Sequence, residues 1–329
     1  MSSYEKILVT LADGKYHSGQ ELGELLGISR AAVWKGIQKL SNDYGIEIFS
    51  VKGKGYRFAK PVELLDAKLI RASLPATIAN QVTQIDVFKS IDSTNQYLME
   101  KSLGKSASGT VVLAETQTAG RGRRGKKWVS PFGRNLYLSV MWRFTQGPAQ
   151  LACLSLVIAV AIVRVLHQMG IVEAGVKWPN DIYWRDKKLA GILLEMRGES
   201  DGPSVVVAGV GINVAMPLDE GQAIEQPWTD LESVLQASVK RNELAANLIS
   251  EIVSVFNHLK DDSQPLLDEW KQMDILKDNM VEVVLPDKVI HGRANGITEM
   301  GALRVLVDGK EMIYHSGEVS IRRDKESKI

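Results

Sequence analysis

The sequence predicts a multi-domain protein of the α/β (α+β) class, built from helices packed on sheets. At 329 residues the chain is too long for one ordinary core, so two or three domains are expected. The first sixty residues have the pattern of short helices followed by a hairpin. The middle carries successive strand patterns and a long apolar helix at 148–170, which is typical of a helix packed against a sheet.

The composition is that of a soluble globular protein, with 45% hydrophobic and 24% charged residues. The net charge of +1 excludes no partner, because a small basic face fits within a neutral total. The most apolar run, 151–163, is too short to cross a bilayer, and no signal-peptide pattern opens the chain. Cys153 has no second cysteine to pair with, and the histidines lack metal-ligand spacing. We therefore expect a cytoplasmic protein without a membrane partner.

The first sixty residues predict a winged helix-turn-helix. Ser18 and Glu21 have capping-box spacing at the start of one helix, and Gly27 can end that helix in a left-handed conformation. Ser29 can then cap a second helix at 30–40. The apolar positions expected to face the core are Leu22, Leu25 and Leu26 in the first helix and Val33, Ile37 and Leu40 in the second.

A hairpin is expected next, with strands at 46–51 and 56–58 around a glycine turn. No acidic residue lies between Leu25 and Asn42, so the second helix presents a basic face. Arginine can bond guanine edges in the major groove, while lysine and serine serve mostly on phosphate. The residues expected to contact DNA are Ser29, Arg30, Lys35, Gln38 and Lys39 on the helix and Lys52, Lys54 and Arg57 on the hairpin. The alternative is a protein-interaction module, because small helical domains with a hairpin also serve that role.

A glycine- and arginine-rich segment, 120–125, follows a β-branched strand at 109–115. It matches the G-x-G-x-x-G pattern of dinucleotide-binding folds, but that fingerprint needs a helix to open inside the motif, and 126–133 is loop sequence. Flexible amides and several guanidinium groups instead predict a loop that closes over an anionic ligand. The alternative is an exposed basic patch for RNA binding or nuclear targeting; flanking strands and Trp128 argue against a free tail.

Three further segments complete the middle of the chain. Ser93-Thr94-Asn95 precedes a helix at 96–103, which Ser93 or Asp92 could simply cap. Lys-Trp-Pro-Asn-Asp at 177–181 leads through a tight turn to Lys188 and an apolar strand. Another strand follows at 204–213, so these strands have a meander pattern. Taken alone, Lys188 is a typical solvated strand end.

In their order and spacing these segments resemble the biotin–protein ligases and, with the N-terminal domain, the bifunctional biotin operon repressors of bacteria. The resemblance covers nearly the whole chain and is carried by residues 93–95, 115–125, 177–181, 188–195 and 209–213. It implies a winged helix-turn-helix domain at 1–62, with a linker beginning near Pro61. It also implies a ligase domain with a seven-stranded mixed sheet at 63–275 and an SH3-like β-barrel at 276–329.

The resemblance implies two half-reactions that use ATP, Mg²⁺ and biotin. The biotin carboxylate attacks the α-phosphorus of ATP, which gives biotinyl-5′-AMP and pyrophosphate. A lysine of the biotin carboxyl carrier protein of acetyl-CoA carboxylase then takes the biotin. Fixed cations suit this chemistry, because two anions must meet and charge accumulates on the phosphate in the transition state.

The resemblance also assigns residues to these steps. Expected for catalysis are Lys188, Arg121, Arg123 and Asp181, with Asp181 also placed near the metal and conceivable as a base for the incoming lysine. Expected for biotin are Ser93, Thr94, Asn95, Gln117, Arg121, Gly122, Arg123, Lys188 and Gly191. Expected for ATP and the adenylate are Arg123, Arg124, Trp128, Asn180, Lys188, Asn213 and Trp228.

The family's repressors dimerise edge to edge through the central sheet when the adenylate orders nearby loops. The homodimer then binds an inverted repeat in the operator of the biotin operon. Ligand-ordered loops favour the dimer because part of the entropy cost of ordering is then already met. Three alternatives stay open: a DNA-binding biotin sensor with an inactive ligase domain, a lipoate or octanoate ligase on the related fold, and an interaction protein that does not bind DNA.

Overall fold

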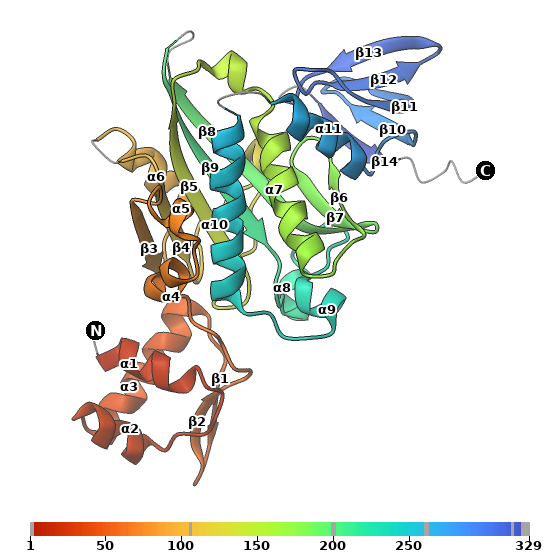
Figure 1. Ribbon diagram of the computed structural model, residues 1–329. Coiled ribbons are helices and arrows are strands. Elements are labelled where there is room, and N and C mark those ends of the chain that lie inside the picture. Colours follow the sequence, from red (N-terminus) through yellow and green to blue (C-terminus); the bar gives the residue numbers. More distant parts are fainter. Residues whose placement is uncertain (1–2, 105–106, 199–201, 260–262, 317–318, 324–329) are drawn as a thin grey trace.

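The computed structural model describes residues 3–104, 107–198, 202–259, 263–316 and 319–323. They form a small N-terminal domain, a central domain built on a large sheet, and an all-β unit near the C-terminus (Figure 1). The central domain lies between the other two in this view (Figure 1). The predicted mixed α/β, multi-domain class is confirmed.

The N-terminal domain packs three helices beside a hairpin. Its elements are α1 (Ser3–Leu11), α2 (Gly19–Leu26), α3 (Arg30–Tyr44), β1 (Ile48–Val51) and β2 (Gly55–Phe58). The predicted capping box is present, because the Glu21 amide donates to Ser18 Oγ over 3.0 Å and the Ser18 amide donates to the Glu21 carboxylate. Gly27 ends α2 at a φ of 66°, and Ser29 caps α3. The helix-turn-helix with its hairpin is therefore confirmed.

Some details of this domain differ from the prediction. Leu25 is 65% exposed, because the face of α2 that turns inward runs through positions 19, 22, 23 and 26. The helix α3 continues past position 40 to Tyr44 and ends at Gly45, where φ is 65°. The strand β1 begins at Ile48 rather than at position 46. A further helix, α1, contributes the fully buried side chains Ile7, Leu8 and Leu11.

The central domain is built on a seven-stranded sheet in the order β3-β4-β5-β9-β8-β7-β6. Its strands are β3 (Gln84–Phe88), β4 (Thr110–Ala114), β5 (Leu136–Phe144), β6 (Ala174–Lys177), β7 (Asp181–Trp184), β8 (Lys187–Gly198) and β9 (Ser204–Ile212). The pair β3–β4 is parallel and the other neighbouring pairs are antiparallel. The expected mixed sheet and the meander from β6 to β9 are both confirmed.

Helices α7 (Leu154–Gln168) and α10 (Arg241–His258) cover one face of this sheet (Figure 1), and α6 (Thr94–Lys101) lies on the other. Along β9, Val206, Ala208 and Val210 join the helical core, whereas Val207 packs with α6. Since side chains alternate along a strand, Gly209 and Gly211 belong to the α6 face. Beside α6 the sheet therefore offers a surface without side chains.

The helical segment Pro148–Gln168, which contains α7, has 21 residues and is long and apolar enough to cross a membrane by composition. This corrects the expectation that the apolar run was too short. Yet 72% of its most apolar 18-residue stretch is buried inside the protein, where it packs against the sheet and α10. Burial in the core, and not length, is what argues for a core helix.

The C-terminal unit is a five-stranded antiparallel sheet in the order β13-β12-β11-β10-β14, which confirms an all-β domain. Its strands are β10 (Met280–Val284), β11 (Val289–Ile297), β12 (Leu303–Val307), β13 (Lys310–Tyr314) and β14 (Ser320–Arg323). Trp178 Nε1 donates to the Gly301 carbonyl over 3.0 Å and joins this unit to the central sheet. The remaining helices are α4 (Ala67–Ala72), α5 (Ala76–Ala79), α8 (Leu218–Gly221), α9 (Leu231–Leu235) and α11 (Gln264–Met273).

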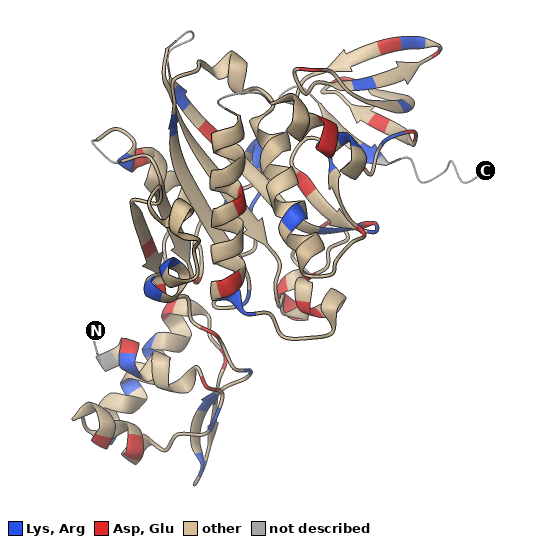
Figure 2. Cartoon of the chain, in the orientation of Figure 1, with Lys and Arg blue, Asp and Glu red and all other residues tan. Residues whose placement is uncertain are grey.

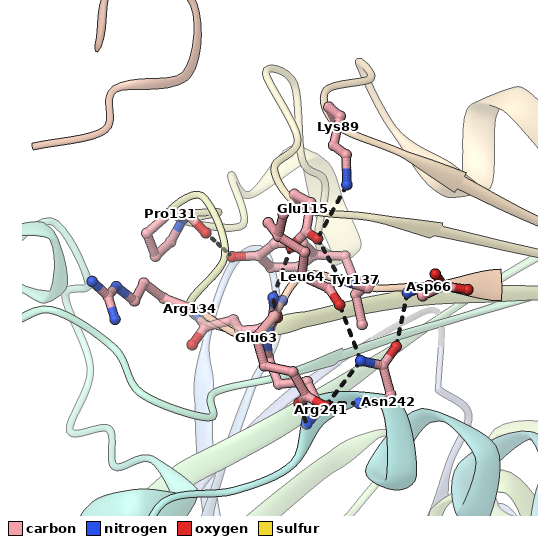
Figure 3. Close-up of polar contacts among 12 residues, drawn as sticks. Glu63, Leu64, Asp66, Lys89, Glu115, Pro131, Arg134, Tyr137, Arg241 and Asn242 are labelled. Carbon is pink, nitrogen blue, oxygen red and sulfur yellow. Dashed lines mark hydrogen bonds and ion pairs between the residues drawn. The ribbon is translucent and has the colours of Figure 1, made fainter. Parts of the chain in front are cut away.

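A buried polar network fastens the segment after the N-terminal domain to the central domain (Figure 3). Arg241, at the start of α10, donates to the Glu115 carboxylate over 2.8 Å, and the two side chains are 4% and 0% exposed. Glu115 also accepts the Leu65 amide over 2.6 Å, and Glu63 accepts the Arg241 amide. Because all these groups are paired, their burial is compensated by hydrogen bonds.

Asp274, between α11 and the C-terminal sheet, has an unusual ionisation. Burial raises the pKa of its carboxyl from 3.8 to about 6, and the Leu276 amide that donates to Oδ1 offsets only part of this. A folded-state pKa above the unfolded value means that the folded protein binds the proton more tightly. The stability that this group contributes is therefore gained as pH falls through 6 and is absent at higher pH.

We expect Asp274→Asn to raise the free energy of unfolding at pH 8 by roughly 2 kcal/mol, because a neutral amide avoids the buried charge. The amide oxygen can still accept the Leu276 hydrogen bond. The gain should shrink to near zero by about pH 4, where the native carboxyl is protonated too. Denaturant unfolding at both pH values measures it, and a gain that does not depend on pH would contradict the assignment.

Candidate active site

Glycines on β8 and β9 form the floor of the candidate site. We call Gly191, Gly209 and Gly211 the glycine floor. A Cβ at Gly211 would lie 2.6 Å from the Trp128 ring, and one at Gly191 would lie 3.1 Å from it. The indole of Trp128 therefore rests on the backbone of both strands. Its Nε1 is buried and has no hydrogen-bond partner among the described residues. A buried donor without a partner needs an explanation, and a ligand acceptor at this place would supply one.

The start of α6 and the segment after β4 form a polar wall beside this floor. Ser93 caps α6. The amide and hydroxyl of Thr94 donate to Gln117 Oε1 over 2.9 and 3.1 Å. Ser139 Oγ on β5 lies 2.7 Å from Thr94 Oγ1 and 2.6 Å from Asn95 Oδ1, so its single hydroxyl proton lies between two acceptors. The predicted residues Thr94, Asn95 and Gln117 thus lie in one hydrogen-bonded cluster, and Ser93 caps the helix beside it.

A second group of contacts connects this wall to the loop 120–128, here named the cationic loop. Asn95 donates to the Glu195 carboxylate over 3.0 Å and lies against Gly209 of the floor. Arg121 of the cationic loop donates to both Glu195 oxygens over 3.2 Å. Glu195 therefore holds a loop guanidinium and a buried amide together on β8.

Lys188 lies beside the glycine floor, after the β7–β8 turn, next to Gly191 and Trp128. Its ammonium lies 2.7 Å from Asp181 Oδ1, and its side chain is only 14% exposed. The ammonium is also 5.6 Å from the centre of the Trp128 ring. Its stem would be 3.3 Å from a Cβ at Gly191. The side chain is therefore not a solvated strand end, and it brings a positive charge to the floor.

Guanidinium groups of the cationic loop reach two other parts of the fold. Arg123 donates to Asn180 Oδ1 over 3.0 Å and also to the Ser316 carbonyl of the C-terminal unit. Arg124 donates to Ser320 Oγ over 2.7 Å. The turn of the loop is a single 3-10 turn, Arg123–Gly125, and no α-helix opens within the motif. This agrees with rejecting the dinucleotide-binding interpretation.

Within the loop, the Gly122 amide donates to the Lys126 carbonyl over 2.6 Å, and the Trp128 amide donates to the Gly120 carbonyl over 2.9 Å. These bonds close the loop on itself. Gly122 is one of the predicted biotin residues of this loop, and its amide makes one of these two bonds. The loop thus carries its cations on a short hydrogen-bonded hairpin rather than on a free chain.

Positive charge concentrates around Asp181. Burial lowers the pKa of the Lys177 ammonium and of the Arg123 guanidinium, and the Asp181 charge opposes the shift in each case. Lys188 and Lys126 add like-charge repulsion on Lys177. An incoming anion would relieve this repulsion and compensate the desolvation, so the site suits a carboxylate or phosphate ligand. No cluster of three metal-ligating side chains occurs in the described part of the chain.

The last two residues predicted for the nucleotide have other partners in this structure. Asn213 Nδ2 donates to the Thr229 carbonyl over 3.1 Å. Trp228 Nε1 donates to the Gly221 carbonyl over 2.9 Å, and the ring packs on that glycine. The Trp228 backbone nevertheless pairs with that of Lys188, so this segment borders the site. Stacking of Trp228 on adenine stays a prediction.

Three family models match successive parts of the chain. The model described as HTH domain matches residues 4–57, and the Biotin/lipoate A/B protein ligase family matches residues 87–213. The Biotin protein ligase C terminal domain matches residues 279–322. The three matches follow the order of the three structural units.

Two curated relatives extend over nearly the whole chain. The present chain is 44% identical over 317 residues to the bifunctional ligase/repressor BirA of Salmonella typhimurium, and the match covers 96% of both chains. It is 43% identical over 318 residues to that of Escherichia coli, again covering 96% of both. The chain belongs to the BirA family. A solved biotin protein ligase from Aquifex aeolicus in complex with biotin and ATP aligns with 74% of this BirA-family chain and 100% of its own, at 26% identity and a TM-score of 0.63.

The second helix of the BirA-family helix-turn-helix presents most of the predicted basic face to solvent. Figure 2 shows lysine and arginine along α3 and the β1–β2 hairpin. The exposed members of the predicted set are Ser29, Arg30, Lys35, Gln38, Lys39, Lys52 and Lys54. Arg57 differs, because its guanidinium carbon lies 5.0 Å from the Tyr16 ring centre and 5.3 Å from that of Phe49. Its side chain is half-buried and helps to pack the hairpin.

Sequence reasoning did not assign roles to several residues that complete the site of this BirA-family chain. Ser139 could have been found by alternation, since it shares a sheet face with Met141 and lies opposite Gly209 on β9. Glu195 and Lys177 were quoted in motifs. Lys177 pairs with Asp181 across the β6–β7 hairpin, whereas no local pattern indicates that Glu195 meets Arg121. Such contacts between distant segments depend on the completed sheet.

Proposed function

We propose that this chain is an ATP-dependent biotin–protein ligase and a biotin-responsive transcriptional repressor. The observation that carries the proposal is its near-complete match to BirA relatives in a fold where the cationic loop and Lys188 meet over the glycine floor. The ligase forms biotinyl-5′-AMP and transfers biotin to a lysine of the biotin carboxyl carrier protein of acetyl-CoA carboxylase. As an adenylate-bound dimer it represses the biotin operon.

Biotin is held between the polar wall and the glycine floor. Its ureido group is a rigid donor–acceptor unit, which suits the hydroxyl and amide groups of Ser93, Thr94 and Gln117, with Asn95 behind them. Its valeryl chain is apolar and lies along the strand at Gly191, in the place where the Trp128 ring now rests, so that ring moves aside to admit it. Trp128 then covers the apolar part, and its free Nε1 gains an acceptor.

Adenylation joins two anions, so the protein's task is to neutralise and align them. The Lys188 ammonium leaves its ion pair with Asp181 and bonds the α-phosphate and the biotin carboxylate. A single ammonium has enough donors to bond both. Arg121 and Arg123 close with the loop and add two guanidinium groups. In a site covered by Trp128 these fixed charges stabilise the negative charge that grows on the phosphate in the transition state. Asp181, once released, can accept a proton from the incoming carrier lysine.

The nucleotide is proposed to lie beside the cationic loop and the segment that borders Lys188. The residues involved are Arg123, Arg124, Trp128, Asn180, Lys188, Asn213 and Trp228. Mg²⁺ typically binds through substrate phosphates with one or two carboxylates and several waters. Asp181 is a single carboxylate next to the phosphate cations and fits that mode. When bound, the ion neutralises triphosphate charge, while the side chains named here orient the reactants.

The catalytic half of the proposal is tested by incubating the protein with biotin, ATP and Mg²⁺ and detecting bound biotinyl-AMP by mass spectrometry. We expect pyrophosphate release, a bound adenylate, and a biotin-sized mass increase on added carrier domain. Lipoate and octanoate are the matched substrates, and neither should give an adenylate. An adenylate formed with lipoate and not with biotin would replace the proposal by the lipoate alternative. DNA binding without any adenylate would support the inactive-sensor alternative.

The strand β8 provides the proposed dimer edge. It has 12 residues, but β7 pairs with it only from Lys187 to Gly191. Residues 194–198 therefore present an edge that pairs with no strand on that side in the described part of the chain. An unpaired edge is a template for another strand. Glu195, which holds Arg121 of the cationic loop, lies within this segment and brings the ligand loop to the edge.

We expect biotin with ATP to tighten dimerisation by roughly ten- to a hundredfold, because the adenylate orders the loop that contacts the edge strand. Sedimentation velocity over a concentration series measures the dimerisation constant. Biotin alone and ATP alone are the controls. A dimerisation constant that is the same with and without both ligands would remove this part of the proposal.

A further inference from the structure

Trp34, on the second helix of the helix-turn-helix, has an unusual environment for a tryptophan. Its side chain is 53% exposed, whereas each of the other six tryptophans is buried or half-buried. A single exposed apolar side chain is ordinary on a protein surface. Tryptophan, however, has a large apolar surface to bury, and this one lies in the second turn of α3.

The geometry of α3 determines which way the indole faces. Val33, Ile37 and Leu40 are buried in the domain core. At about 3.6 residues per turn, Trp34 lies on the outward side of the helix with Gln38 one turn further on. The neighbouring outward positions are Ala31, Lys35, Gln38 and Asn42, all exposed. In this motif, residues near the start of the second helix reach the base edges in the major groove.

The surroundings of the indole favour DNA as the occupant of this face. Arg30, Lys35 and Lys39 are exposed, and no acidic residue lies between positions 25 and 42. Lysines of the hairpin extend the positive charge. Phosphate is attracted to such a face, but an apolar ring gains nothing from phosphate. Among the groups that a base pair displays in the major groove, the C5 methyl of thymine is the apolar one.

We propose that Trp34 is a specificity-determining residue that packs on a thymine methyl in each operator half-site. The proposal rests on the repressor part of the proposed function and adds the chemistry of one base position. Lysine and serine contacts with phosphate hold the helix in place but carry no sequence information. Trp34 contributes a preference for a T·A pair at one position, while Arg30 and Gln38 can bond polar base edges.

A first experiment defines the base position. Wild type and Trp34→Ala, each saturated with biotin and ATP, select sites from a randomised duplex library. We expect the wild-type half-site to contain a thymine for which Trp34→Ala shows no preference, while the other selected positions stay the same. Val9→Ala is the matched control, because Val9 is an exposed apolar residue (47%) on α1 of the same domain. It should select the wild-type site.

A second experiment removes only the methyl group. Deoxyuridine replaces that thymine in the selected duplex, which leaves base pairing and charge unchanged. We expect wild-type affinity to fall roughly five- to tenfold and the affinity of Trp34→Ala to be unaffected. Trp34→Phe, which keeps an apolar ring, should retain part of the sensitivity. Carrier biotinylation by both variants should equal that of wild type, which shows that the rest of the chain is intact.

The outcomes separate this proposal from the function on which it rests. Equal thymine preference in wild type and Trp34→Ala, or an equal loss of affinity on deoxyuridine substitution, overturns the role of Trp34 and leaves the repressor function standing. A liganded wild-type protein that selects no duplex at all overturns the repressor function, and the role of Trp34 with it. Methyl sensitivity that disappears only in Trp34→Ala supports both.

Discussion

Lys188→Ala is expected to lower the rate of biotinyl-AMP formation by at least about a hundredfold, the size of effect that loss of one preorganised charge produces in other active sites. The ammonium lies 2.7 Å from Asp181 and beside Trp128 and Gly191, where the two reacting anions are proposed to meet. Without it, the Asp181 carboxylate also faces the incoming phosphate without its ion-pair partner. Pyrophosphate release measured at saturating biotin and ATP reports the rate.

Two variants control this prediction. Lys187→Ala removes the neighbouring exposed lysine of β8 and should leave the rate within about twofold of wild type, since surface charges contribute little. Lys188→Arg keeps the charge but changes its shape, so it should recover only part of the activity. The thermal unfolding midpoint of Lys188→Ala should match wild type closely. Wild-type adenylate formation by a folded Lys188→Ala protein would exclude Lys188 from the chemistry.

Arg241→Met is expected to reduce the free energy of unfolding by about 3–5 kcal/mol, because it leaves the Glu115 carboxylate buried without its main partner. The pair is 2.8 Å apart and almost fully covered. Lys89, whose ammonium lies 3.8 Å from Glu115, is partly exposed and too distant to replace the guanidinium. Arg241 also donates to the backbone carbonyls of Glu63 and Asn135, so these acceptors lose their donor as well (Figure 3).

The matched control is Arg185→Met, which breaks an exposed pair with Glu173 whose side chains are 64% and 55% exposed. Its effect should stay below about 1 kcal/mol. The double variant Glu115→Gln with Arg241→Met should recover part of the lost stability, since no unpaired charge is then buried. Denaturant unfolding compares all four proteins. An Arg241→Met protein as stable as Arg185→Met would show that the buried network does not stabilise the junction.

Local chemistry accounts for what the sequence predicted correctly. The Ser18–Glu21 capping box, the left-handed Gly27 and the Ser29 cap depend on residues within one turn of one another, so their pattern is visible in the chain. The meander strands likewise follow from apolar runs bounded by turns. Leu25 shows the limit of local reasoning. Its spacing fits an apolar stripe, but the buried side of α2 is decided by where α1 and α3 pack.

The site itself is mostly non-local, so sequence pattern alone could not assemble it. Arg121 meets Glu195 across 74 positions of sequence, and Arg123 meets Asn180 across 57. The predicted DNA contact of Arg57 stays a prediction, and no local pattern indicated that its guanidinium group packs beside two aromatic rings. The family resemblance supplied the order of the motifs, whereas the partners of each side chain come from the fold.

We propose that the cationic loop and Lys188 neutralise a nucleotide phosphate while the carboxylate of biotin is joined to it. A crystal structure with a non-hydrolysable biotinyl-AMP analogue tests this most directly. We predict that Lys188 Nζ leaves Asp181 and bonds a phosphate oxygen, with Arg123 within hydrogen-bonding distance of the same group and Trp128 over the biotin chain. A bound analogue whose phosphate lies far from Lys188 and Arg123, with both side chains in solvent, would exclude these two residues from phosphate binding.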